Sequence, residues 1–166
     1  MKKLSDSDRL LSLSLVDHKD GMSLKPMELS LKAVAEKLMS GMAVTYLYDK
    51  GKISDKNFLS ADFVALIVEG GPSIQTLKSN EILKKIGGFV GAATGDLKDA
   101  TTYLWFIPLP RSITDMPELV WFKRALAQLI GIKPRYEALV EAFLPKNPML
   151  EFLGEFMDQQ WFEFLI

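Results

Sequence analysis

The sequence contains no cysteine and only one histidine, His18. Without cysteine, the chain forms neither disulfides, nor thiolate zinc sites, nor iron–sulfur clusters. A Ser-His-Asp triad would have to use His18, which lies in the polar stretch DHKDG, where a solvated surface residue is expected. Asp17 and Asp20 partly match a calcium loop, but Lys19 stands where that motif needs an acidic residue. We therefore expect no metal, no cofactor and no catalytic residue, and predict that the chain is not an enzyme.

The sequence also lacks a charge excess and a long apolar run. Its 20 basic and 21 acidic residues give a formal net charge of −1, so a nucleic-acid partner is not expected. No uninterrupted apolar stretch is long enough to span a bilayer, so no transmembrane segment is predicted. The start, MKKLSDSDRLL, lacks the apolar core of a secretory signal. These features, with the missing cysteines, predict a cytoplasmic protein.

The residues that are present predict one folded unit. Hydrophobic residues make up 48% of the chain and charged residues 25%, which is typical of a globular protein. We expect residues 1–166 to form a single globular domain. The predicted fold class is mainly α, a compact helical bundle of about six or seven helices, because apolar spacings of three and four recur. One or two short strands in the middle third are the alternative.

Local signals place the expected helices. A first helix is predicted within residues 4–21, where Ser5 and Asp8 form a capping-box pattern. A second begins at Pro26 and buries an apolar stripe, with further turns reaching residue 51. That stripe comprises Leu29, Leu31, Val34, Ala35 and Leu38. In the last third, helices are predicted from Pro117 to Gly131, from 134 to 144 and from 148 nearly to 166. Segments 62–68 and 96–107 fit either a strand or a helix.

The stretch EILKKIGGFVGAATGD, residues 81–96, carries a glycine cluster. As a helix it would place Gly87, Gly91 and Gly95 on one face, with Gly88 beside them. Mid-helix glycines cost about 0.5–1 kcal/mol each relative to alanine, so a close contact is expected to offset them. That contact is either packing within the fold or an interaction face for a second copy or partner helix; a loop is the third alternative. Neither phosphate-binding glycine template fits the spacing.

Two further segments are candidate binding sites. Lys133 and Arg135 lie at an expected helix start, where free N–H groups favour a phosphate or a lipid headgroup; an ordinary solvated helix end is the alternative. The closing segment, 149–166, is predicted to be the last core helix. Its extra aromatic residues, with Trp161 among them, make a partner groove the second interpretation.

Two stretches resemble the Golgi phosphoprotein family. LSDSDRLLSLSLVDHKDG (4–21) is similar to the family's opening motif, and GMAVTYLYDKGKI (41–53) to its following helix. The resemblance implies a largely helical protein peripheral to membranes, of a kind that reads a phosphoinositide headgroup and tethers glycosyltransferases. Leu31 and Ser40 stand where the family's lipid site has a tryptophan and an arginine, so no binding residue is carried over.

Residues 29–54 also resemble a winged-helix unit, whose recognition helix would run from Gly41 to Asp49 without a basic residue. Taken together, the sequence predicts a non-catalytic interaction module acting through apolar and small-residue helix faces, with a protein partner or a homo-oligomer. One alternative is a peripheral protein that binds an anionic headgroup, and another is a winged-helix-like regulator with weak DNA binding. An acid–base enzyme would need two carboxylates facing each other.

Overall fold

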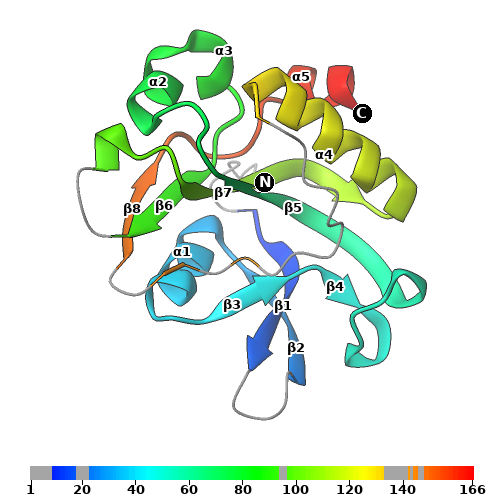
Figure 1. The fold of residues 1–166 in the computed structure, drawn as a ribbon. Coiled ribbons are helices and arrows are strands. Elements are labelled where there is room, and N and C mark those ends of the chain that lie inside the picture. The colour runs from blue at the N-terminus through cyan, green and yellow to red at the C-terminus, as the bar shows by residue number, and fades with distance from the viewer. Residues whose placement is uncertain (1–8, 18–22, 94–96, 133–141, 143, 146–147) are drawn as a thin grey trace, which may run out of the picture.

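The computed structural model describes residues 9–17, 23–93, 97–132, 142, 144–145 and 148–166 (Figure 1). These residues form a mixed α/β fold with two antiparallel sheets, one of three strands and one of five. The predicted mainly α helical bundle is therefore wrong. The two sheets share one cluster of buried apolar side chains, to which both central strands of the larger sheet contribute.

The smaller sheet contains the segment that was expected to be the first helix. Its strands follow the order β2-β1-β3, and they are β1 (Leu11–Asp17), β2 (Ser23–Leu29) and β3 (Ala43–Thr45). Leu11, Leu13 and Leu15 alternate with serines and are all buried. This period of two puts the leucines on one face of a strand, and it outweighs the capping pattern that favoured a helix.

Helix α1 (Leu31–Met39) confirms most of the second apolar stripe. Leu31, Val34, Ala35 and Leu38 are its buried residues. The helix begins later than expected, because Ser30 is the N-cap and accepts a hydrogen bond from the Ala33 backbone N–H at 3.1 Å. The expected start at residue 26 lies within β2, an edge strand, where a proline can be accommodated without losing a ladder bond on its open side.

The larger sheet has the order β4-β5-β7-β6-β8, formed by β4 (Leu47–Tyr48), β5 (Phe58–Val68), β6 (Phe89–Ala93), β7 (Tyr103–Ile113) and β8 (Pro148–Phe152). Two of its strands contain the ambiguous segments of the middle third: 62–68 lies within β5, and 96–107 enters β7 at Tyr103, after a short 3₁₀ helix at Leu97–Asp99. The centre of the sheet is a stack of rings: Phe106 lies 4.5 Å from Phe63 and 5.0 Å from Phe89, centroid to centroid. Continuous apolar runs form these strands because both faces of the sheet are covered.

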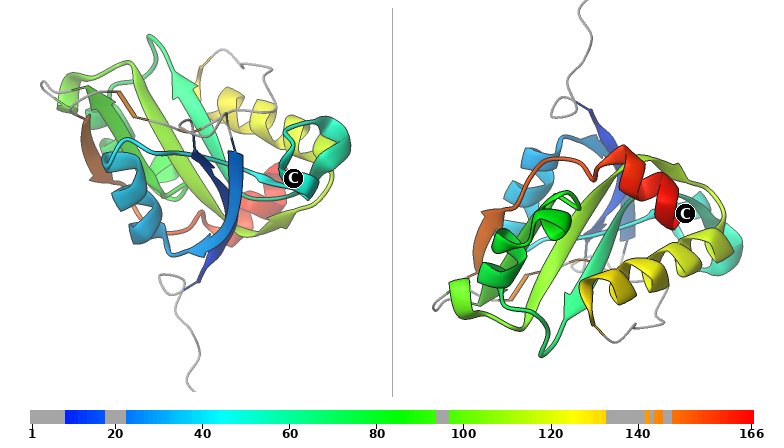
Figure 2. Two further views of the ribbon diagram at one scale, coloured as in Figure 1. Left: turned by 90° about the horizontal axis from the view of Figure 1, so that it is seen from below. Right: turned by 90° about the horizontal axis from the view of Figure 1, so that it is seen from above.

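Helices cover one face of the larger sheet, and α1 with the smaller sheet lies on the other (Figures 1 and 2). The covering helices are α2 (Ile74–Ser79), α3 (Glu81–Lys84), α4 (Met116–Ile130) and α5 (Gln159–Leu165). Helix α4 matches its prediction, with Asp115 as N-cap and Gly131 at φ 90° as C-cap. No helix of the described residues is long and apolar enough to cross a membrane.

Three other helix predictions are wrong. Of segment 81–96, the described residues 81–93 form the short α3, a turn and β6, while the residues at 43–48 form β3 and β4 instead of a recognition helix. The expected helix at 148–166 is β8, a loop and the short α5. Most of the helix expected at 134–144 lies outside the described residues. These errors share a cause, because local glycine and proline signals do not report which segments pair across a sheet.

Candidate functional site: a basic cleft at the end of β7

Strand β7 extends beyond its neighbour β6, and this leaves an opening in the sheet. Pairing between the two strands covers only Leu104, Trp105 and Phe106 of β7. Beyond them come Pro108 and Pro110, whose nitrogens carry no hydrogen to donate to another strand. Strand β7 nevertheless continues past both prolines to Ile113, since proline's fixed φ suits extended backbone. The strand therefore has one side without a strand partner.

The loop between β8 and α5 occupies this open side. The Met157 backbone N–H donates to the Pro108 carbonyl at 3.0 Å, and the Asp158 N–H donates to the Lys85 carbonyl at 2.8 Å. The Gly88 N–H donates to the Glu155 carbonyl at 2.8 Å. These bonds tie the loop to β7 and to the turn after α3, so the backbone around the opening is held from both sides.

Glycines permit the backbones to approach closely here. Gly87 and Gly88 have φ of 75° and 76°, which side chains rarely adopt. A Cβ at Gly87 would lie 2.9 Å from the Glu155 carbonyl oxygen, and one at Gly88 would overlap the Phe106 carbonyl oxygen. Gly154 packs against Gly87 in the same way, with its own Cβ position 3.2 Å from the Gly87 Cα. Gly87 and Gly88 therefore allow close packing of backbone segments within the fold.

A cleft of about 490 Å³ lies between these segments. Three cationic side chains line it, one from two residues before the start of β1 and two from the end of α3. Two carboxylates and one aromatic ring also contribute. The lining residues with these side chains are Arg9, Lys84, Lys85, Glu155, Phe156 and Asp158. The cleft therefore combines positive charge, hydrogen-bond acceptors and an aromatic surface.

Arg9 is held in place at the cleft. One of its guanidinium nitrogens, Nη1, donates to the Leu109 carbonyl of β7 at 2.8 Å. The guanidinium carbon also lies 5.5 Å from the centroid of the Phe156 ring, within the range of a cation–π contact. The arginine keeps further N–H donors beyond these contacts, because a guanidinium has five. It is therefore positioned to donate to an anion in the cleft.

The lysines are less constrained. Lys84 lies 3.6 Å from Glu81 in an exposed i, i+3 ion pair, a kind that contributes little stability. Both lysines are exposed, and within the described part of the chain Lys85 forms no ion pair. Asp158 is partly committed, since its Oδ1 accepts from the Trp161 backbone N–H at 3.1 Å as the N-cap of α5. The charged side chains that line the cleft are three cations and two carboxylates, so its formal charge is +1 (3 − 2).

Two buried polar groups lie apart from the cleft. Asp62, in β5, accepts from the Ser12 backbone N–H at 2.7 Å and from the Ser112 hydroxyl, so both carboxylate oxygens are used in joining three strands. Burial, followed by the neighbouring Tyr48, raises the pKa of the Tyr46 phenol above its ordinary value. Neither group offers an acid–base pair. Among the described residues, no three histidines, aspartates or glutamates are grouped to hold a metal ion.

The site residues predicted from the sequence do not converge. Gly87 lines the cleft, whereas Gly91 lies within β6 under the Leu144 side chain, so no common helix face exists. Trp161 lies on α5. Gly95, Lys133 and Arg135 lie outside the described residues, so the anion site at the latter two stays a prediction. The residues that do line the cleft were missed, although the sequence KKIGG placed two lysines beside the glycine pair.

Comparison with known proteins gives two structural neighbours. The chain matches no family model and no curated protein, so its resemblance to the Golgi phosphoprotein family stays a prediction. The primase-polymerase domain of cyanophage S-2L aligns over 97% of this chain and 90% of its own, with 12% identity and a TM-score of 0.46. The catalytic domain of the primase RepB′, solved with initiator DNA, aligns over 95% and 83%, with 10% identity and a TM-score of 0.46.

One neighbour is a domain of a primase-polymerase and the other is the catalytic domain of a primase. They differ from the non-catalytic interaction module, not an enzyme, that the sequence predicted, and that prediction is not kept. The winged-helix alternative is wrong because the residues at 43–48 form β3 and β4 where it needs a recognition helix. The headgroup-binding alternative gains no support, since Lys133 and Arg135 lie outside the described residues. A TM-score of 0.46 and an identity of 10–12% nevertheless assign no reaction, substrate or catalytic residue to this chain. The function must therefore be argued from the cleft itself.

Proposed function

We propose that the cleft binds a nucleotide, with the phosphate held by the three cationic side chains. The observation that carries the proposal is the convergence of Arg9, Lys84 and Lys85 on one cleft from two distant segments. Guanidinium and ammonium groups form charge-assisted hydrogen bonds with phosphate oxygens, and these are about twice as strong as neutral ones. The formal net charge of −1 does not oppose this, because the positive charge is local.

The remaining lining suits the other parts of a nucleotide. The volume of about 490 Å³ is in the ordinary range for sites that enclose a small molecule. The Glu155 carboxylate can accept hydrogen bonds from ribose hydroxyls or from the amino group of a base. The Phe156 ring offers an apolar edge beside the Arg9 guanidinium, and aromatic and guanidinium planes are the common partners of nucleic-acid bases.

The same residues are compatible with an enzyme. Cations placed beside a phosphate stabilise the charge that develops when a phosphoryl or nucleotidyl group is transferred. Arg9 is the best placed for this role, since its contacts with Leu109 and Phe156 fix the guanidinium before a ligand arrives. A preorganised donor needs little rearrangement during a reaction.

Isothermal titration calorimetry with ATP, with its nucleoside and with inorganic pyrophosphate tests the proposal. We expect ATP to bind, pyrophosphate to compete with it and the nucleoside to bind more weakly. The double substitution Lys84→Gln with Lys85→Gln removes two exposed charges. It should weaken ATP binding by about tenfold or more, which corresponds to about 1.4 kcal/mol.

The matched control is Lys25→Gln with Lys52→Gln, which removes the same charge from exposed positions in β2 and near the end of β4. This variant should bind ATP as the parent chain does. Equal loss in both variants would mean that only net charge matters, and no ATP or pyrophosphate binding by the parent chain would reject the nucleotide site.

A further inference from the structure

A pair of aromatic rings lies beside the cleft on α5. Phe164 is 78% exposed, more than any other large apolar side chain of the described residues. Its ring meets that of Trp161 edge to face, with centroids 5.8 Å apart and planes at 85°. These two side chains and Gln160 line a shallow hollow of about 270 Å³. The rings thus offer aromatic surface to solvent at a place where the fold does not bury it.

The residues that line the hollow directly follow, in sequence, residues that line the cleft. Gln159 lines the cleft, and the next residue, Gln160, lines the hollow. Asp158, on the cleft wall, accepts the hydrogen bond from the Trp161 backbone N–H. Residues 158 and 161 are therefore about one helical turn apart, or about 5 Å along the axis. Two adjacent units of one flexible polymeric ligand can therefore contact the cleft and the hollow at the same time.

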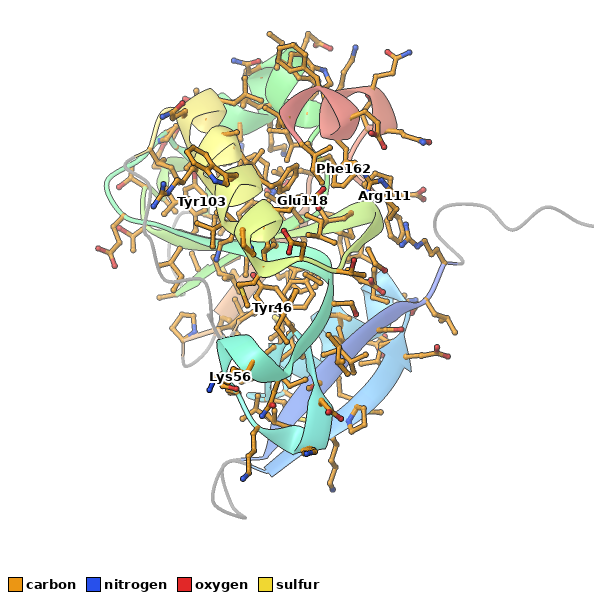
Figure 3. The ribbon with its side chains drawn as sticks, turned by 90° about the vertical axis from the view of Figure 1, so that its right-hand side faces the viewer. Tyr46, Lys56, Tyr103, Arg111, Glu118 and Phe162 are labelled. Atoms are coloured by element: carbon orange, nitrogen blue, oxygen red, sulfur yellow. The ribbon has the colours of Figure 1, made fainter. Side chains whose placement is uncertain are left out.

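The charges around the rings also matter for the choice of occupant. Glu163 lies on the same helix, but its carboxylate pairs with Arg111 at 3.2 Å, so its charge is compensated. The Arg111 guanidinium in turn lies 4.9 Å from the centroid of the Phe162 ring, at the base of α5 (Figure 3). The hollow is lined by two aromatic side chains and one amide, and carries no charged side chain of its own.

We propose that the ligand is single-stranded nucleic acid, with one nucleotide in the cleft and the base of the next stacked on Trp161 and Phe164. This rests on the proposed nucleotide site and specifies its substrate class. Single-strand binding sites combine cations that follow the phosphates with exposed aromatic rings, on which any base can stack. A free nucleotide would occupy the cleft alone and leave the aromatic pair unused. A duplex would keep its bases stacked within itself and gain nothing from the rings.

The test compares labelled oligothymidylate with ATP in the parent chain, in Phe164→Ala and in Trp121→Ala. Trp121 is the matched control, because it is 67% exposed on α4 and does not line the hollow. Fluorescence anisotropy should show that Phe164→Ala binds the oligonucleotide about fivefold to a hundredfold more weakly, the usual range for losing one stacking ring. ATP binding should stay unchanged in both variants. Phe164→Trp should restore oligonucleotide binding.

The outcomes separate the two proposals. If ATP binds but the oligonucleotide binds no more tightly than ATP, or if Phe164→Ala has no effect on the oligonucleotide, the strand proposal is wrong and the nucleotide site stands. Equal weakening by Trp121→Ala would also overturn it, as would tighter binding of duplex than of single strand. Because Phe164 is exposed, its replacement should leave the melting temperature unchanged, so loss of folding does not confuse the result.

Discussion

The centre of the five-stranded sheet and the cleft at its end are built in different ways. At the centre, β5 and β7 pair over most of their length, and the Phe63–Phe106–Phe89 stack is entirely buried. At the cleft, β7 has no strand partner on one side, and a loop without regular structure is held there by single hydrogen bonds to backbone carbonyls. Side-chain packing determines the first region, and close backbone approach determines the second. The chemistry-bearing side chains gather at the second.

The largest effect should come from the centre. Phe106→Ala removes the middle ring of the stack and leaves a cavity between Phe63 and Phe89. We expect the free energy of unfolding to fall by about 3–5 kcal/mol, the range for deleting a buried phenylalanine ring. Urea denaturation followed by circular dichroism measures it. A loss below about 1 kcal/mol would show that the centre is not the more tightly packed region.

The next effect should come from the backbone contacts of the cleft. Gly88→Ala places a Cβ against the Phe106 carbonyl at a φ of 76°, so both strain and overlap oppose it. The expected loss is about 2–4 kcal/mol. Gly41 is the control, because it has φ 94° with open space around it, and Gly41→Ala should cost only about 1 kcal/mol. Equal costs at the two glycines would remove the argument for close approach.

A smaller loss of stability is expected from removing the buried Asp62 carboxylate, which links three strands by hydrogen bonds. Asp62→Ala leaves the Ser12 N–H and the Ser112 hydroxyl without their acceptor, and we expect a loss of about 1–3 kcal/mol. Glu28→Ala, at an exposed position of β2, should change stability by less than about 0.5 kcal/mol. Thermal melting of the two variants side by side distinguishes a buried clamp from a surface carboxylate.

The comparison also explains what could be predicted from the sequence. Helix α4 was predicted because its signals are local: a proline in the first turn, a buried stripe and the glycine at 131 all lie within one segment. The stripe of α1 was recognised for the same reason. Strand β1 was missed, although Leu11, Leu13 and Leu15 alternate with serine, because adjacent Leu10 and the capping pattern suggested a helix.

The cleft depends on relations that a single sequence does not express. Arg9 and the two lysines at the end of α3 line one cleft because β7 extends beyond the residues that pair with β6. Which residues pair is a property of the whole sheet. The glycine pair was recognised as a site of close contact, but it was placed on a helix, and its partner was left open between the fold itself and a second copy or partner helix. In the structure Gly87 meets the loop containing Glu155, and Gly88 meets Phe106 of β7. Local periodicity contains no information about such a contact.

Trp105 connects the two regions and has a practical consequence. Its ring is fully buried, it directly precedes Phe106 in β7, and its indole N–H donates to the carbonyl of Gly87, a residue of the cleft wall, at 2.9 Å. Indole emission responds to the hydrogen bond that the ring makes. A substance that displaces the Gly87 turn on entering the cleft should shift the emission of this ring, so the protein carries its own optical reporter of occupancy, and no dye has to be attached.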